Sequence, residues 1–190
     1  DDAPDLYDQA FALYALSAAH RELGEARARD LALETLQAMS GAMAHPAGGW
    51  VEAIPPVTPR RQNPHMHMLE AMLAWKALAP DVVFTRTADR CLDLMRTRFR
   101  VDGTVREYFT DDLILDPQRG AVVEPGHQME WAWLLLEAGA AILGVAFMVK
   151  AGMWPLCFWL PTTYSAAAAP VAAIFAIMSK VGVYILLRLS

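Results

Sequence analysis

The sequence predicts an all-α protein in which helical hairpins are followed by a two-helix transmembrane hairpin. Before residue 140, segments with apolar residues at helical spacing alternate with short turns and long loops. All 21 acidic residues lie at or before Glu137. The part that follows holds two nearly continuous apolar runs of about 20 residues each, the length of a membrane span. We therefore expect two domains, residues 1–140 in water and residues 141–190 in lipid.

The first predicted hairpin covers residues 6–43. Its first helix reads LYDQAFALYALSAAHREL and ends at Gly24, because glycine readily adopts the left-handed conformation that closes a helix. Its second helix reads EARARDLALETLQAMSGAM and follows after a short turn. A loop that contains HPAGGWVEAIPPVTPRRQ leads out of this hairpin.

The second hairpin and the start of a third are marked by capping residues. Asn63 is predicted as an N-cap, with Pro64 at the first helical position, where its missing N–H has no cost. The next helix is predicted to begin at Asp81 and to end near Arg100. A second irregular stretch follows, and Pro125 opens a fifth helix.

The long loops after the two hairpins resemble each other. Residues 49–52 read GWVE, and residues 103–107 read GTVRE. A repeat of helix, turn, helix and long loop, with a period of roughly 50 residues, indicates stacked helical hairpins. The long loops should then lie at one end of the stack, where a site can be built.

Two segments share the spacing H-x-x-E, His67 with Glu70 and His127 with Glu130. Positions i and i+3 lie on one helix face, so each glutamate can accept a hydrogen bond from its histidine and fix the tautomer. Each histidine follows a proline-led helix start, where the helix dipole disfavours imidazolium. Two neutral imidazoles that face one site would suit proton abstraction next to a carbonyl.

Side chains of the neighbouring loops are candidates for holding a substrate. Arg60, Arg61 and Asn63 could bind sugar hydroxyls or an enediolate oxygen. Aromatic residues could stack on a sugar ring: Trp50, Tyr108, Trp131 and Trp133. Plainer interpretations stay open, since His–Glu pairs on helices are commonly solvated and helix tryptophans commonly lie in the core. We predict no cofactor and no metal, because the spacing is not the H-E-x-x-H arrangement of zinc sites.

Residues 6–140 resemble the N-acylglucosamine 2-epimerase family, which includes mannose isomerases and cellobiose 2-epimerases. Four segments carry the resemblance: YDQAFALYALSAA, GGWVEAIPP, RRQNPHMHMLEAMLAW and VVEPGHQMEWAWLLL. It implies an (α/α)6 toroid that moves a proton at sugar C2 through an enediol-type intermediate, as a 2-epimerase or an aldose–ketose isomerase. The candidate catalytic residues are then His127, which matches an acid/base histidine, and His67, in the sugar pocket. Candidate substrate-binding residues are Arg61, Asn63, Glu130 and Trp50.

Such a toroid would be incomplete in this chain, which holds about two and a half of six hairpins. The family's second acid/base histidine and its first hairpins have no counterpart. Because each repeat is stabilised by its neighbours, we expect the pocket residues to be present and catalysis to be weak or absent. The acidic N-terminus, with neither Met nor an apolar signal core, indicates that the chain begins inside a longer one.

Residues 142–189 are predicted to cross the membrane twice, with a polar turn at residues 161–165. Lys150 and Lys180 lie within the apolar runs, and each would cost at least roughly 2.5–3.5 kcal/mol at the bilayer centre. A role in a proton path is therefore predicted, with snorkelling to the interface as the alternative. Arg188 indicates that both ends of the hairpin are cytoplasmic, so we expect inner-membrane attachment with residues 1–140 in the cytoplasm.

The same segment resembles the antiporter subunits of multisubunit sodium/proton (Mrp-type) exchangers, the D-type subunit above all, and the related subunits of respiratory complex I. The resemblance rests on FMVKAGMWPLCFWLPTTYSAAAAPVAAIFAIMSKVGVYILLRL and implies that Lys150 and Lys180 belong to a proton channel. The chain thus reads as fragments of two unrelated families joined near residues 137–142. Predicted partners are a small sugar, the lipid bilayer through residues 141–189, and other antiporter subunits; a net charge of −5 gives no reason to expect nucleic acid.

Overall fold

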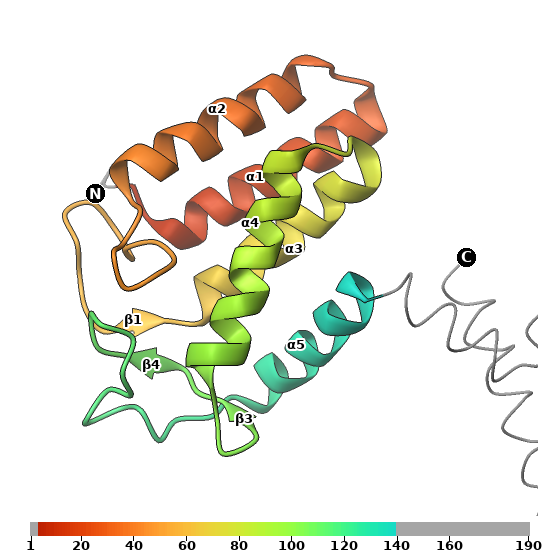
Figure 1. The fold of residues 1–190 in the computed structure, drawn as a ribbon. Helices are drawn as coiled ribbons and strands as arrows, with labels where there is room; N and C mark the ends of the chain where they lie inside the picture. Colours follow the sequence, from red (N-terminus) through yellow and green to blue (C-terminus); the bar gives the residue numbers. More distant parts are fainter. Residues whose placement is uncertain (1–3, 140–190) are drawn as a thin grey trace, which may run out of the picture. The chain divides into compact units, whose positions relative to one another are not determined.

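The computed structural model describes residues 4–139, and the chain divides into two units, Asp1–Leu135 and Leu136–Ser190. The α-helices of the described part are α1 (Leu6–Leu23), α2 (Arg27–Ala42), α3 (Asn63–Leu78), α4 (Val82–Leu94) and α5 (Pro125–Ala138). A π-helical turn, η1 (Met95–Phe99), continues α4, and the short strands are β1 (Arg60–Arg61), β2 (Arg100–Val101), β3 (Thr104–Val105) and β4 (Tyr108–Phe109). The predicted helical hairpins are confirmed (Figure 1).

The predicted transmembrane hairpin, residues 141–190, lies outside the described residues, as do Lys150 and Lys180. Within residues 4–139, no helix has both the length and the apolar character needed to cross a membrane. The division into domains at residue 140 stays a prediction.

Local signals set the ends of the first and fourth helices. The Asp5 side chain accepts a hydrogen bond from the Tyr7 N–H at 2.7 Å and so caps α1. Gly24 closes α1 in the left-handed conformation, as the sequence predicts. The carboxylate of Asp81 accepts from the Val83 N–H at 2.9 Å, which makes Asp81 the N-cap of α4. A hairpin turn therefore follows α1, and α4 begins where it is predicted to begin.

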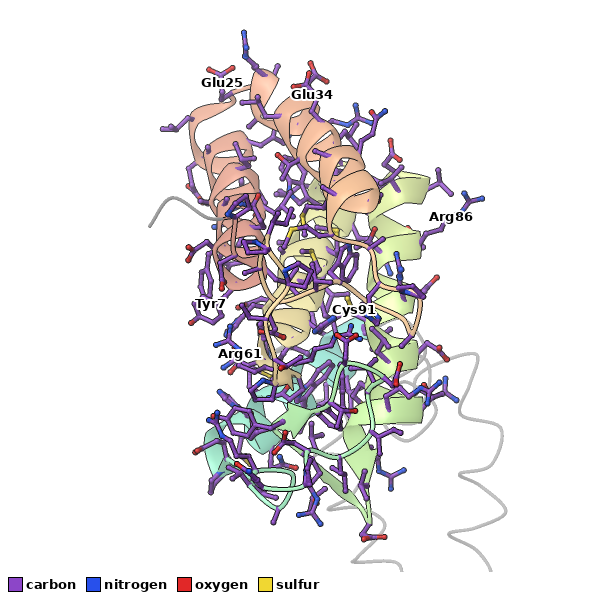
Figure 2. The ribbon with its side chains drawn as sticks, turned by 90° about the vertical axis from the view of Figure 1, so that its left-hand side faces the viewer. Tyr7, Glu25, Glu34, Arg61, Arg86 and Cys91 are labelled. Atoms are coloured by element: carbon purple, nitrogen blue, oxygen red, sulfur yellow. The ribbon has the colours of Figure 1, made fainter. Side chains whose placement is uncertain are left out.

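Helix α3 is the centre of the described core and packs against both α1 and α4 (Figure 1). Trp75 joins these three helices, because its Nε1–H donates to the Leu13 carbonyl at 2.9 Å and its ring stacks on Phe84 at 5.1 Å. Cys91 lies in the same core as a free thiol, and burial raises its pKa to about 12 (Figure 2). This packing leaves the N-terminal turn of α3 as the part of the helix that meets the loops.

The strands and long loops gather at the end of the helices where α3 and α5 begin (Figure 1). Strand β1 pairs antiparallel with β4, and β2 with β3. An isolated bridge between Asp5 and Ala53 brings the start of α1 to the same end. The prediction that the long loops share one end is confirmed, and the candidate site residues lie there.

The predicted N-cap at Asn63 is wrong. Asn63 is already inside α3, and the preceding Gln62 has helical backbone angles (φ −71°, ψ −32°) with no side-chain cap. Both side chains are used elsewhere, in hydrogen bonds to residues of α5. A helix start with two polar residues withheld from capping indicates a functional constraint at this place.

Two glycines with similar backbone angles allow a matched test of the loop packing. A methyl group added to Gly24 (φ 66°) would meet no atom within 4 Å, whereas one added to Gly49 (φ 66°) would lie 2.9 Å from Cδ2 of His65. We expect Gly24→Ala to lower the free energy of unfolding by about 1–2 kcal/mol through backbone strain. Gly49→Ala should cost about 1–3 kcal/mol more, because it also overpacks the His65 ring. Urea denaturation measures both, and equal losses would contradict the close packing.

Candidate active site

His127 lies in the first turn of α5, and both of its ring nitrogens meet polar partners. Its Nδ1 is 2.9 Å from Oε2 of Glu107, and its Nε2 is 3.0 Å from Nδ2 of Asn63. The Gln62 amide nitrogen is 3.2 Å from the same Nδ1. The imidazole remains 24% exposed, so a small molecule can still reach it. The ring is therefore oriented by the protein and accessible at once.

A buried amide and an indole extend this cluster. Gln62 donates from Nε2 to Oε2 of Glu107 at 2.9 Å, and its Oε1 accepts from Nε1–H of Trp131 at 2.5 Å. Glu107 is 4% exposed and Gln62 is fully buried. Oδ1 of Asn63 and Oε1 of Glu107 are buried and have no hydrogen-bond partner among residues 4–139. The floor of the candidate site thus consists of polar side chains, Gln62 and Glu107, that are buried from solvent.

His67 lies one helical turn after Asn63 in α3 and faces two carboxylates. Its Nδ1 is 3.1 Å from Oε2 of Glu70 and 3.6 Å from Oε1 of Glu130. The rings of Tyr7 and Phe11 from α1 pack against the imidazole, at centroid distances of 5.3 and 4.7 Å. Donor atoms of His67, Glu70 and Glu130 lie within 4.8 Å of one another, so these three residues could hold a cation.

The two H-x-x-E segments behave differently. The pairing predicted for His67 with Glu70 is confirmed at 3.1 Å. The pairing expected for His127 with Glu130 is replaced, because His127 takes Glu107 as its carboxylate and Glu130 turns toward His67. Asn63 and Glu130 each reach across to the other helix, which links the two histidines through facing sides of α3 and α5.

The two loop arginines have different positions. Arg61 is 38% exposed on its side chain, and its Nε donates to Oε2 of the buried Glu52 at 2.7 Å. Burial raises the pKa of Glu52, and the hydrogen bonds from Arg61 oppose that shift. Figure 2 shows Arg61 on the same edge of the described part as Tyr7, an aromatic neighbour of His67. Arg61 can therefore still offer N–H groups to a ligand.

Arg60 is a correction to the expectation that it binds sugar. It is fully buried, and its guanidinium donates to the carbonyls of Gly48, Trp50 and Asp111 at 2.6, 3.0 and 2.8 Å. Desolvation by burial lowers its pKa. The side chain ties loops together and has no surface for a ligand.

Trp50 is a second correction. A ring that stacks on a sugar needs an exposed face, but Trp50 is 2% exposed and packs beside His65 at a centroid distance of 5.8 Å. Trp131 is likewise buried, at 1%, whereas Trp133 is 49% exposed. The plainer interpretation, which places the helix tryptophans in the core, is right for Trp131 and wrong for Trp133.

Sequence reasoning missed Glu107, Gln62 and His65. The sequence contained a signal for the first, because the resemblance between residues 49–52 and 103–107 aligns Glu52 with Glu107. Both glutamates are buried: Glu52 accepts from Arg61 of β1, and Glu107 contacts His127 at the start of α5. Gln62 carried no signal, since its partners lie 45 to 69 residues away in the chain.

Two protein-family models match this chain. The family model described as N-acylglucosamine 2-epimerase (GlcNAc 2-epimerase) matches residues 1–150. The chain belongs to the N-acylglucosamine 2-epimerase family. A second family model, described as the NADH:quinone oxidoreductase/Mrp antiporter transmembrane region, matches residues 120–190. Both resemblances drawn from the sequence are therefore confirmed, and the two matches overlap around the predicted junction at residues 137–142.

Individual relatives of the epimerase family and of the antiporters each match part of the chain. A mannose-6-phosphate isomerase of Rhizobium meliloti (strain 1021) is 38% identical over 143 residues, 72% of this chain and 37% of that protein. A probable K(+)/H(+) antiporter subunit of the D type, from the same organism, is 67% identical over 55 residues, 29% of this chain and 10% of that protein. The cellobiose 2-epimerase from Spirochaeta thermophila DSM 6192 is 26% identical with a TM-score of 0.66, over 74% of this chain and 38% of that one. The chain thus spans well under half of each relative.

His65 provides a test of the buried polar network around the site. Its ring is fully buried, its Nε2 accepts from the Trp50 N–H at 3.3 Å, and desolvation lowers its pKa to about 3. Below pH 6.5 the unfolded chain binds a proton at His65, whereas the folded chain does not bind one until about pH 3. The free energy of unfolding therefore falls as the pH falls below 6.5. Between pH 7.5 and pH 5 we expect a loss of about 2 kcal/mol in the free energy of unfolding from His65.

The measurement is chemical denaturation of the full chain and of His65→Gln at both pH values. Glutamine can accept from the Trp50 N–H and does not titrate, so the variant should lose this part of the pH dependence. An equal pH dependence in the two proteins would show that folding does not shift the pKa of His65.

Proposed function

We propose that residues 4–139 form a sugar-processing site of the 2-epimerase or aldose–ketose isomerase type. The observation that carries this proposal is the convergence of His127 and His67 from facing helices, with Asn63 and Glu130 reaching between them. The family assignment and the 38% identity to a mannose-6-phosphate isomerase support it. Mannose and N-acetylmannosamine are the substrates that we would test first.

In the proposed reaction, His127 removes the proton from C2 of an open-chain sugar. The C–H electron pair then forms the C1–C2 double bond of an enediolate, and the negative charge moves to the carbonyl oxygen. Arg61 and the amide of Asn63 can donate hydrogen bonds to sugar oxygens. Return of a proton to C2 re-forms the C1 carbonyl and gives the epimer or the starting sugar. Return to C1, with transfer of the O2 hydroxyl proton to O1, leaves the carbonyl at C2 and gives the ketose. His67 takes part in the sugar pocket, where Glu70 and Glu130 hold its ring.

A single base next to the substrate is enough for proton exchange at C2 but not for epimerisation. Epimerisation needs a second acid on the opposite face of the sugar, which the family supplies from a segment without a counterpart here. Exchange of the C2 proton with solvent needs only one base, because the proton on His127 can exchange before it returns. We therefore expect slow C2 exchange and turnover that is weak or absent.

The test is deuterium incorporation into C2 of mannose or N-acetylmannosamine in D₂O, followed by NMR. The full chain should exceed the protein-free blank, and His127→Ala should lower the rate at least about 100-fold, the effect of a lost general base. His20→Gln is the matched control, since His20 lies near the end of α1 and its Nδ1 contacts the Glu25 carbonyl rather than a residue of the site. Folded protein with no exchange and no sugar-induced shift of the His127 signals would rule out the proposed site.

The second candidate function is a membrane cation/proton antiporter subunit fragment. The 67% identity to a D-type antiporter subunit supports it, together with the family match over residues 120–190. Lys150 and Lys180, which lie outside the described residues, would be the proton-path residues. This proposal also implies attachment to the inner membrane through residues 141–189, with the epimerase-like part in the cytoplasm and antiporter subunits as partners.

Reconstitution into vesicles with an imposed pH gradient tests this second function. The full chain should speed the decay of the gradient, and Lys150→Ala should remove the increase, because a neutral side chain cannot relay a proton. Lys76→Ala is the matched control, since Lys76 lies in the last turn of α3. Equal decay with Lys150→Ala and the unchanged chain would exclude a proton path through this lysine.

A further inference from the structure

Glu107 stands out as a buried carboxylate that sequence reasoning did not place in the site. It lies in the short connection between β3 and β4 and is 4% exposed. Its Oε2 is 2.9 Å from Nδ1 of His127 and 2.9 Å from Nε2 of Gln62. Among the described residues, His127 is the one ionisable group within ion-pair distance of this carboxylate.

The orientation of Gln62 follows from its third partner. An indole N–H can only donate, so Nε1 of Trp131 must meet the oxygen of the Gln62 amide. The amide nitrogen of Gln62 is therefore the atom that faces Glu107 and His127, and it is also a donor. Two donors cannot bond each other. When Nδ1 of His127 carries a hydrogen, the Gln62 amide nitrogen therefore donates to Glu107 and not to His127.

The protonation of His127 follows in turn. An ionised carboxylate only accepts, so the 2.9 Å contact with Glu107 is a hydrogen bond when Nδ1 is the protonated nitrogen. Nε2 is then the nitrogen with the free lone pair, and it accepts from Nδ2 of Asn63 at 3.0 Å. The contacts on both sides of the ring are satisfied together by this one tautomer.

We propose that Glu107 is the positioning residue of the site: it holds His127 as the Nδ1–H tautomer and so makes Nε2 the atom that accepts a proton. This inference deepens the proposed sugar function and rests on it. When Nε2 takes the C2 proton, the imidazolium is stabilised by the carboxylate of Glu107, which accepts the hydrogen bond from Nδ1–H. The sugar must displace the Asn63 amide from Nε2, and that amide can then hold a sugar oxygen.

The other carboxylate near His127 does not fit this role. Glu130 follows His127 by one helical turn, as the sequence predicts for an orienting group, but its Oε1 lies 3.6 Å from His67. The buried position of Glu107 also favours it, because a carboxylate with few solvent contacts interacts strongly with a neighbouring charge. In the described part of the chain, Oε1 of Glu107 has no hydrogen-bond partner, so the hydrogen bonds that offset its burial come through Oε2, which faces His127 and Gln62.

The experiment is NMR of the full chain in detergent with histidine labelled by ¹⁵N, which is tractable because the sequence holds five histidines. His127→Gln identifies the His127 signals by their loss. At neutral pH the unchanged chain should show His127 protonated on Nδ1, and Glu107→Ala should convert it to a mixture that contains the Nε2–H form. The matched control is Glu124→Gln, an exposed carboxylate three residues before His127, which should leave the tautomer unchanged.

Glu107→Gln keeps the volume of the side chain and covers the case in which the alanine variant does not fold. It retains an acceptor for Nδ1–H but loses the charge, so C2 exchange should fall at least about 10-fold at saturating sugar with little change in KM. An Nε2–H tautomer in the unchanged chain, or an unaltered tautomer in Glu107→Ala, would overturn the inference. Absence of C2 exchange with the Nδ1–H form present would defeat the proposed function and leave the role of Glu107 in place.

Discussion

The buried guanidinium of Arg60 is the contact on which the functional end of the protein depends. It donates to carbonyls of Gly48 and Trp50, in the loop after α2, and of Asp111, in the loop after β4. A cation with no exposure is costly to desolvate, and several carbonyl acceptors are needed to offset that cost. Loops that come from both hairpins are thereby fixed against β1. Because β1 runs directly into α3, the position of the first turn of α3 is fixed by the same contact.

This constraint explains why the start of α3 can disregard the usual capping chemistry. Asn63 is a residue type that commonly satisfies free N–H groups at a helix start, yet its side chain and that of Gln62 both turn to α5. The helix is held by burial between α1 and α4 and by the strand before it, so the lost cap is tolerated. The start of α3 lacks the stabilisation of a side-chain cap, and the two amides contact His127 instead. Departures of this kind from local rules are common at functional sites.

The sequence predicts those parts of the fold and site that depend on near neighbours. Gly24, Asp81 and Pro125 mark helix ends through local chemistry, and the His67–Glu70 contact follows from helical spacing. The partner of His127 could not be predicted in this way, because Glu107 belongs to a different element and only packing brings it close. The burial of Trp50 could not be predicted either, because the residue types of a loop do not show which of its side chains other elements will bury.

Helix α5 shows how far the site is independent of the rest of a toroid. Met129, Trp133 and Leu136 recur at helical spacing and are 73%, 49% and 52% exposed in the part of the chain that the structure describes. In stacked repeats such an apolar face is covered by the next repeat. The partners of His127, however, come from the α3 start and the β3–β4 connection, on the covered side of α5. The orientation of the base is therefore fixed within two hairpins and the helix that follows. In the reaction proposed above, delivery of a proton to the other face of a sugar would require repeats beyond them. We therefore propose that C2 exchange and epimerisation are separable in this fold.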